Sequence, residues 1–147
     1  MGNGVDFLNG GGKRGDDSEY VQIGATKTIN GVKGHIVKRR GDSDDHSNLP
    51  RYADTSEIYF RKNAGGVCQA RAYIGKKMCI DFDWSHNHRN KTDGRSFKEG
   101  TVHVQIWKWH SDGSFTRLSD NARFMNNSEM KKYGGIIKEF CPNVKFR

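Results

Sequence analysis

Apolar and polar residues alternate strictly in two stretches of the chain, and this alternation predicts two β-strands. Residues 78–85 read MCIDFDWS, and residues 101–109 read TVHVQIWKW. One face of each strand is expected to be buried, and the other to meet solvent or a ligand. The residues on that second face are Asp81, Asp83, His103 and Gln105.

A polar loop connects these two strands and carries the run His86-Asn87-His88-Arg89-Asn90. The stretch from Met78 to His110 holds four of the six histidines and all three tryptophans. Histidine, carboxylate and guanidinium groups are the usual parts of acid–base and phosphate sites. We therefore expect any active site at this end of the two strands.

Weaker alternation and turn signals predict further strands on both sides of this stretch. The dipeptides Asn30-Gly31 and Asp112-Gly113 favour tight turns between paired strands. The additional strands expected are residues 20–28, 32–40, 56–62, 67–74 and 114–118.

The register between residues 67–74 and 78–84 follows from placing all apolar residues on one face. A three-residue turn at residues 75–77 achieves this, and it also sets an arginine opposite an aspartate. The pairs expected are Ile74 with Met78, Ala72 with Ile80, Ala70 with Phe82, Cys68 with Trp84, Arg71 with Asp81 and Gln69 with Asp83.

The last part of the chain has helical periodicity. Asn126 or Asn127 is expected to cap the helix, with Glu129 in the first turn, and Pro142 to stop it. Gly134-Gly135 weakens it by roughly 1–2 kcal/mol relative to alanine. Residues 144–146 are expected to add an edge strand. The apolar helical face consists of Met130, Tyr133, Ile136, Ile137 and Phe140.

These elements predict an α+β fold built on an antiparallel twisted sheet of about six strands. One or two helices accompany the sheet, and the C-terminal helix packs on it. Residues 1–19 are rich in glycine and are interpreted as a flexible lead-in. Residues 20–147 are expected to form a single domain.

Composition adds a strong positive charge to this picture. The chain has 25 Lys and Arg against 17 Asp and Glu, a formal net charge of +8. A compact basic domain attracts polyanions, and nucleic acid is the commonest of these. The three cysteines lack CxxC spacing, which argues against a zinc ribbon and a disulfide framework. No apolar run is long enough to span a membrane, and no signal peptide is visible.

Metal-free acid–base catalysis is the interpretation that we favour for the histidines. RNA carries its own nucleophile, the 2′-OH, so cleavage needs a base, an acid and cations near the phosphate. Histidine suits acid–base work because its pKa lies near neutral pH. The catalytic candidates are His86, His88, His103 and Asp83. The substrate-binding candidates are Arg71, Arg89, Lys108, Gln105 and Trp107.

A divalent metal is the alternative, since three histidines with an open fourth position form a catalytic zinc set. Its ligands would be His86, His88 and His103, with Asp81 supplying carboxylate oxygen. An HNH nuclease is disfavoured, because the helix expected after its second strand, with a metal-binding histidine, is not visible.

A purely structural interpretation also stands for several of these residues. Asp81 and Asp83 can pair with Arg71 and other basic residues across the sheet. Trp107 and Trp109 lie on the face of His103, where we expect packing rather than base stacking.

Two segments carry a resemblance to a known class of protein. QARAYIGKKMCIDFDWSHNHRN followed by GTVHVQIWKW, together with NARFMNNSEMKKYGGIIKEF, resembles the C-terminal toxin domains of bacterial polymorphic toxins of the Rhs and contact-dependent-inhibition types. The resemblance covers roughly half of the chain. This chain has His103-Val104-Gln105 where related tips tend to show HVH, which argues further against a strict metal site.

The resemblance implies the tip of a secreted antibacterial effector that acts in the cytoplasm of a target cell. It also implies a cognate immunity protein, and many such tips are similar to small basic ribonucleases of the barnase, EndoU or colicin type. We therefore expect a monomeric ribonuclease domain without a required cofactor. The alternatives are a metal-dependent DNase that uses the same histidines and a non-enzymatic module that binds nucleic acid or protein.

Overall fold

A computed structural model describes most of the expected domain. The residues that it describes are 20–39, 49, 53, 56–63, 66–75, 77–85, 87–89, 94–117 and 122–147. The expected lead-in at residues 1–19 and the side chains of His86 and His88 lie outside this description.

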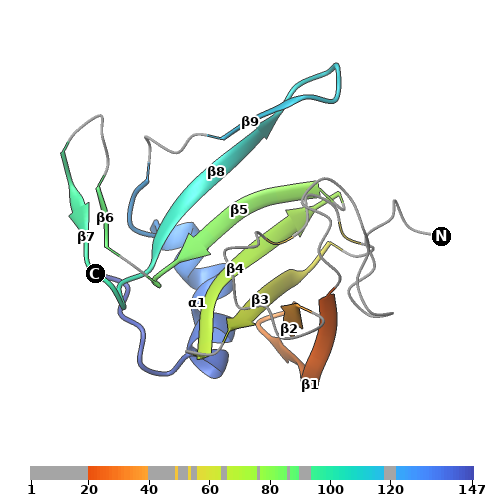
Figure 1. Cartoon of the computed structure of the whole chain (residues 1–147), viewed down its shortest axis with the longest axis vertical. Coiled ribbons are helices and arrows are strands. Elements are labelled where there is room, and N and C mark those ends of the chain that lie inside the picture. Colours follow the sequence, from red (N-terminus) through yellow and green to blue (C-terminus); the bar gives the residue numbers. More distant parts are fainter. Residues whose placement is uncertain are drawn as a thin grey trace.

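A seven-stranded sheet with the strand order β1-β2-β3-β4-β5-β8-β9 forms the centre of the molecule (Figure 1). A separate two-stranded sheet, β6-β7, is inserted between β5 and β8. The strands are β1 (Tyr20–Ile29), β2 (Val32–Arg39), β3 (Ile58–Asn63), β4 (Gly66–Ile74), β5 (Lys77–Asp83), β6 (His88–Arg89), β7 (Ser96–Phe97), β8 (His103–Trp109) and β9 (Phe115–Arg117). With helix α1 (Asn127–Phe140), they confirm the α+β class.

The sheet differs from the expectation in strand number and direction. The described residues form more strands than the six expected, and β2 and β3 pair in parallel, whereas the other neighbours are antiparallel. Parallel neighbours need a long crossover, and residues 40–57 between β2 and β3 provide that length. Local alternation does not report strand direction, so the sheet is mixed rather than purely antiparallel.

The register between β4 and β5 is confirmed in its inner part and wrong at its turn. Arg71 pairs with Asp81, and the apolar pairs on either side are those expected. However, Ile74 pairs with Lys77, and a β-bulge at Cys79 absorbs the one-residue difference. The bulge turns Met78 to the opposite face of the sheet, and Ile74 is left 53% exposed.

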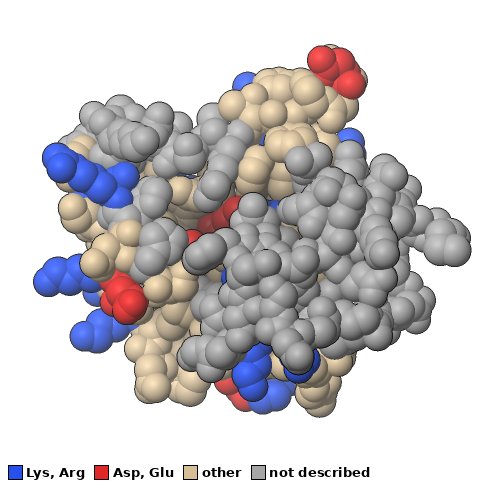
Figure 2. Space-filling model, viewed as in Figure 1, with Lys and Arg blue, Asp and Glu red and all other residues tan. Residues whose placement is uncertain are grey.

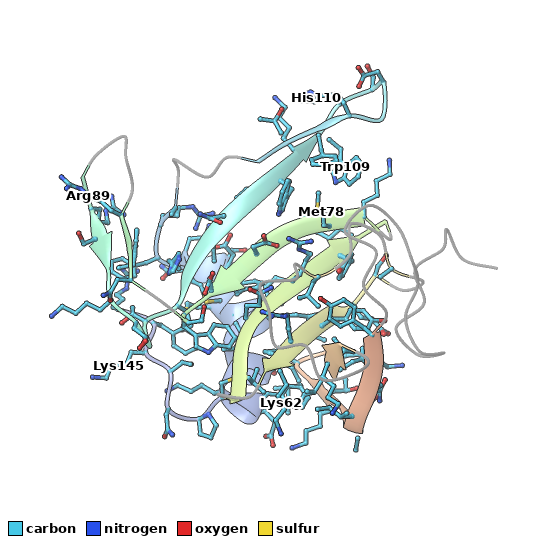
Figure 3. All side chains as sticks on the ribbon, viewed as in Figure 1. Lys62, Met78, Arg89, Trp109, His110 and Lys145 are labelled. Carbon is cyan, nitrogen blue, oxygen red and sulfur yellow. The ribbon has the colours of Figure 1, made fainter. Side chains whose placement is uncertain are left out.

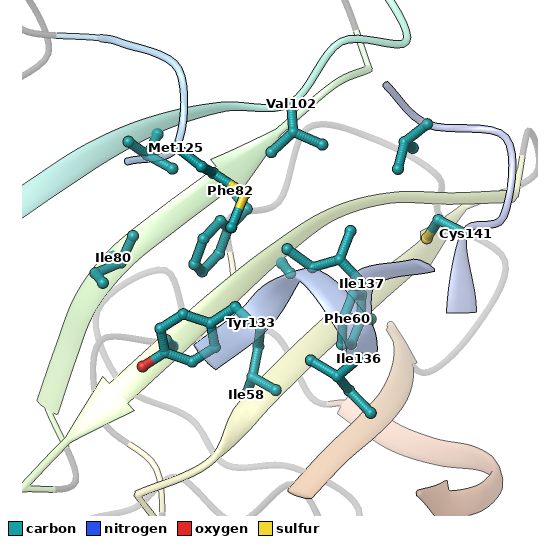
Figure 4. Close-up of a cluster of buried hydrophobic side chains, with 14 of the residues drawn as sticks. Ile58, Phe60, Ile80, Phe82, Val102, Met125, Tyr133, Ile136, Ile137 and Cys141 are labelled. Atoms are coloured by element: carbon teal, nitrogen blue, oxygen red, sulfur yellow. The ribbon is translucent and has the colours of Figure 1, made fainter. Parts of the chain in front are cut away.

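Helix α1 covers one face of the sheet and forms the main core with it (Figure 4). The expected apolar helical face is confirmed, with Tyr133, Ile136 and Ile137 buried and its flanking residues partly buried. Tyr133 packs against Phe82 with ring centroids 5.2 Å apart. Burial of these side chains is the main source of stability for a helix that carries two glycines.

Asn126, one of the two residues expected to cap α1, begins the helix with a capping box. The Asn126 side chain accepts a hydrogen bond from the backbone N–H of Glu129 at 2.8 Å, and the Glu129 carboxylate accepts one from the Asn126 N–H at 2.9 Å. The same carboxylate forms two hydrogen bonds with Arg123, at 2.7 and 2.9 Å. The backbone of Arg123 is also bonded to Val104 of β8, so the start of the helix is attached to the sheet.

The chain after α1 returns to the sheet. Lys145 forms an isolated parallel bridge with Thr101, where an edge strand at residues 144–146 was expected. The backbone N–H of Val102 donates to the Lys145 carbonyl at 2.7 Å, and Val144 is buried. The C-terminal segment therefore lies beside the chain that enters β8, close to the base of the β6-β7 hairpin (Figure 1).

The two adjacent glycines of α1 are expected to respond oppositely to alanine. A Cβ on Gly134 would meet Met130 at 3.5 Å, an ordinary contact, whereas a Cβ on Gly135 would lie 2.7 Å from Ile29 Cγ2. Gly134→Ala should raise the free energy of unfolding by up to about 1 kcal/mol. Gly135→Ala should lower it by about 1 kcal/mol, since overpacking outweighs the gain in helix propensity. Urea denaturation of both variants checks this, and equal effects would contradict the packing described.

The Glu129 carboxylate is expected to make stability depend on acidic pH. Partial burial raises the pKa of Glu129, but its hydrogen bonds to Arg123 and Asn126 outweigh burial and hold the pKa below the ordinary 4.5. A lowered pKa in the folded state stabilises the fold above pH 4.5, and this contribution is lost as the pH falls through the folded pKa. Thermal unfolding of wild type and Glu129→Gln should therefore differ at neutral pH and converge as the pH falls through the folded pKa.

A matched control for this prediction is Glu139→Gln on the same helix. Glu139 forms an exposed ion pair with Lys27, and exposed pairs contribute little to stability. A difference between wild type and Glu129→Gln that stayed constant as the pH fell would contradict the role given to Glu129.

Candidate functional site

The two faces of the sheet differ in their chemistry. The face under α1 is apolar, whereas the opposite face carries aromatic side chains among buried polar ones. The polar residues buried in the described part of the chain are His35, Arg61, Arg71, His103 and Gln105. Strand alternation directs them away from the helix-side core. The candidate site is therefore on the face that α1 leaves uncovered.

Arg71 and Asp81 form the central interaction of this face. Two hydrogen bonds join the guanidinium to the carboxylate, from Nε to Oδ1 at 2.6 Å and from the second terminal nitrogen to Oδ2 at 3.0 Å. The other terminal nitrogen of Arg71 donates to the carbonyl of Leu49. The indole ring of Trp107 lies 5.4 Å from the guanidinium carbon. This arrangement satisfies a buried charge from several sides.

The expected substrate-binding role of Arg71 and Gln105 is not supported by their position. Their exposed fractions are 4% and 3%, so neither side chain is open to solvent, although both lie on the face of the sheet that was expected to be exposed. Trp107 is partly buried and packs edge-on against Phe115 with centroids 5.3 Å apart, a contact that agrees with the packing expected for it. These residues form the base of the polar face, and the alternation could not reveal what covers them.

A hydroxyl group shares this buried environment. Tyr73 is fully buried, and burial raises its pKa well above the ordinary 10.0, although the nearby Arg71 charge partly opposes that shift. Its ring packs edge-on against Tyr59 with centroids 5.6 Å apart. Tyr73 therefore stays protonated at neutral pH and belongs to the packed part of the face.

Asp83 and His103 lie opposite each other where β5 ends and β8 begins, two residues along these strands from Asp81 and Gln105. The imidazole of His103 is 1% exposed and stacks on Phe97, with ring centroids 5.2 Å apart and an angle of 25° between planes. Its Nδ1 atom lies 3.5 Å from the Thr101 carbonyl. The Asp83 carboxylate accepts hydrogen bonds from the backbone N–H and hydroxyl of Ser85, both at 2.9 Å. The structure thus brings together two of the expected catalytic residues.

An open cavity of about 530 Å³ lies at the β6-β7 hairpin. The hairpin pairs His88 with Phe97 and Arg89 with Ser96. Phe97 is common to the cavity and the Asp83–His103 pair, because it is one of the residues that line the cavity and its ring stacks on the His103 imidazole. The residues that line the cavity are Asn87, Arg89, Ser96, Phe97, Lys98 and Glu99.

The remaining expected site residues divide between this cavity and other places. Arg89 is exposed at the cavity, as a phosphate ligand requires. Lys108 is exposed on β8, but alternation sends it to the face opposite that of His103. Lys108 is therefore not brought together with the other candidates. Among the described residues, no group of three or more histidine, cysteine, aspartate or glutamate side chains is suited to hold a metal ion.

A second histidine–carboxylate pair was missed from the sequence. His35 Nε2 lies 2.5 Å from Glu57 Oε1, and His35 Nδ1 lies 3.2 Å from the Gln22 side-chain oxygen. Its ring stacks on Tyr59 at 4.7 Å. His35 lies on the same face of β2 as Lys33, and this polar position was a signal that the sequence offered. Its partner Glu57 comes within reach only because β2 and β3 pair in parallel.

Comparisons with known proteins do not identify the chain. No family model, no curated protein and no solved structure matches it. In the part of the chain that the structure describes, no helix is both long and apolar enough to cross a membrane.

Replacing Asp81 alone is expected to destabilise the fold more than replacing both Asp81 and Arg71. Asp81→Leu leaves the Arg71 charge buried and unpaired, and should lower the free energy of unfolding by about 3–5 kcal/mol. The double variant Arg71→Leu/Asp81→Leu should recover most of that loss. Asp112→Ala, at an exposed turn, is the control and should change stability much less. A double variant no more stable than Asp81→Leu in urea denaturation would contradict this structural role.

Proposed function

We propose that this chain is a ribonuclease domain of a secreted antibacterial effector, and that it cleaves RNA without a metal. The main support is the junction between the Asp83–His103 pair and the cavity at the β6-β7 hairpin. There, the ring of Phe97 stacks on a histidine that has a carboxylate opposite it, and Phe97 also belongs to the lining of an open cavity that carries Arg89 and Lys98. These are the groups that cleavage of a phosphodiester by its own 2′-OH requires.

In this proposal, the exposed Arg89 and Lys98 bind the scissile phosphate and stabilise the charge that develops on it. His103 transfers a proton, and the Asp83 carboxylate is the acidic group opposite it in the sheet. Phe97 covers the imidazole in the free protein, so substrate binding has to displace this ring. His86 and His88 remain candidates for the second proton transfer, since His86 precedes Asn87 and His88 precedes Arg89 in the sequence.

The effector context rests on a different kind of support. The resemblance of residues 69–109 and of the C-terminal helix to polymorphic toxin tips suggests delivery into a target cell. A neutralising immunity protein would then protect the cell that makes the toxin. The net charge of +8 agrees with a polyanionic substrate.

The test is cleavage of a fluorescent RNA by the purified chain. His103→Asn should reduce the rate by at least about 100-fold, as expected for loss of an acid–base group. Arg89→Gln, a change at an exposed residue, should also reduce the rate without affecting folding. His110→Asn is the matched control, since His110 is exposed just beyond the other end of β8 and bonds Thr116 (Figure 3). Circular dichroism establishes that each variant is folded.

A chelator and a DNA substrate separate the remaining alternatives. The proposal predicts that EDTA leaves RNA cleavage unchanged and that DNA, which lacks the 2′-OH, is not cut. Loss of activity with EDTA, or cleavage of DNA, would favour the metal-dependent nuclease. A folded wild-type chain that cuts neither polymer would contradict enzymatic activity and favour a binding module.

A further inference from the structure

Exposed basic side chains continue from the candidate cavity along one edge of the molecule. We call Arg89, Lys98, Lys145 and Arg147 the basic strip; all four are exposed. Figure 2 shows Lys and Arg side chains gathered at the left edge, where Figure 1 places the hairpin and the C-terminus. Figure 3 labels Arg89 and Lys145 on this same side. The strip therefore joins two segments that are far apart in the sequence.

Backbone hydrogen bonds fix the C-terminal half of the strip beside the hairpin. The Lys145 N–H donates to the Gly100 carbonyl at 2.9 Å, and the Val102 N–H donates to the Lys145 carbonyl at 2.7 Å. Residues 100–102 directly follow Lys98 and Glu99 of the cavity. Lys145 is consequently anchored within a few residues of the cavity wall.

Aromatic contacts connect Arg147 to the same wall. Its guanidinium carbon lies 5.6 Å from the centre of the Phe124 ring. Phe124 in turn packs edge-on against Phe97, with centroids 5.0 Å apart. Since Phe97 lines the cavity and covers His103, a short chain of packed rings relates Arg147 to the candidate site.

We propose that the basic strip binds the backbone phosphates of a single RNA strand as the strand leaves the cleavage site. This inference rests on the proposed function and names its substrate as a strand several nucleotides long rather than a dinucleotide. Lysine and arginine neutralise phosphates without reading sequence, and the strip is a continuation of the cavity where cleavage is proposed. The lining of the cavity contains the basic residues Arg89 and Lys98 and the acidic residue Glu99, so its charged groups are mainly basic.

The position of exposed apolar side chains, away from the strip, favours RNA over an acidic protein as its partner. Protein interfaces have a buried core in which charged residues are depleted and aromatic or apolar ones are enriched, whereas nucleic-acid interfaces are polar and strongly basic. Among the described residues, the exposed large hydrophobic side chain is Ile74, at the β4-β5 turn and not in the strip. Within the described residues, the strip thus presents charged side chains, and the rings beside it, Phe124 and Phe146, are partly buried.

Binding is measured with a labelled 2′-O-methyl RNA of about 12 nucleotides. This probe lacks the nucleophilic 2′-OH, so it reports binding independently of cleavage. Lys145→Gln/Arg147→Gln should raise its Kd roughly tenfold at moderate salt, since two charge-assisted contacts are lost. The slope of log K against log salt should fall in magnitude by about 1.4. Cleavage of a dinucleotide, which does not reach residues 145–147, should be unchanged.

The control is Lys38→Gln/Lys62→Gln, which removes the same charge from exposed positions on β2 and β3 (Lys62 is labelled in Figure 3). The inference is overturned if both double variants weaken binding equally, because net charge alone would then explain it. Wild type that fails to bind the probe also overturns it, and would leave an acidic protein as the partner to test. If the strip variant alone weakens binding but natural RNA is never cut, the strip binds RNA and the ribonuclease proposal fails.

Discussion

The buried guanidinium of Arg71 is the constraint around which the centre of the sheet is arranged. Arginine remains charged under all ordinary conditions, so it can be buried only where fixed partners surround it. Asp81 on β5 supplies two hydrogen bonds, the Leu49 carbonyl supplies another, and Trp107 on β8 covers the planar group. One side chain therefore links β4, β5, β8 and the connection that precedes β3.

The polar face acquires a gradient of accessibility from this arrangement. Around Arg71 the polar groups are closed off and serve the fold, as the exposed fractions of Arg71 and Gln105 show. Two residues farther along, where β5 ends and β8 begins, the chain leaves the sheet to form the β6-β7 hairpin, and a cavity opens there. His103 lies at the boundary, buried behind Phe97 but adjacent to that cavity. The position of the hairpin between two paired strands is what brings loop cations near a strand histidine.

Much of the local structure could be predicted from the sequence. Alternation and a matching charge pair predicted the inner register of β4 and β5, because a one-residue slip would reverse every apolar side chain. The helix cap at Asn126 and the apolar stripe of α1 followed from short-range rules. The predicted length of the turn before β5 was wrong, because the bulge at Cys79 adds one residue to β5 and leaves no sign in the alternation of apolar and polar residues. No pattern within the sequence of β2 or β3 indicated that the two strands pair in parallel.

The candidate site divides in the same way. The sequence by itself determined which side chains of one strand share a face, because alternation along a strand is a property of the backbone. The pairing of β5 with β8, which sets Asp83 opposite His103, came from the tertiary structure. Only the tertiary structure decided which side chains meet solvent. Burial of His103 depends on Phe97, and that of Arg71 on residue 49 and Trp107, which reach them across the sheet from other segments. Accessibility is a property of the whole packing, so no local pattern could have distinguished the buried arginine from the exposed Arg89.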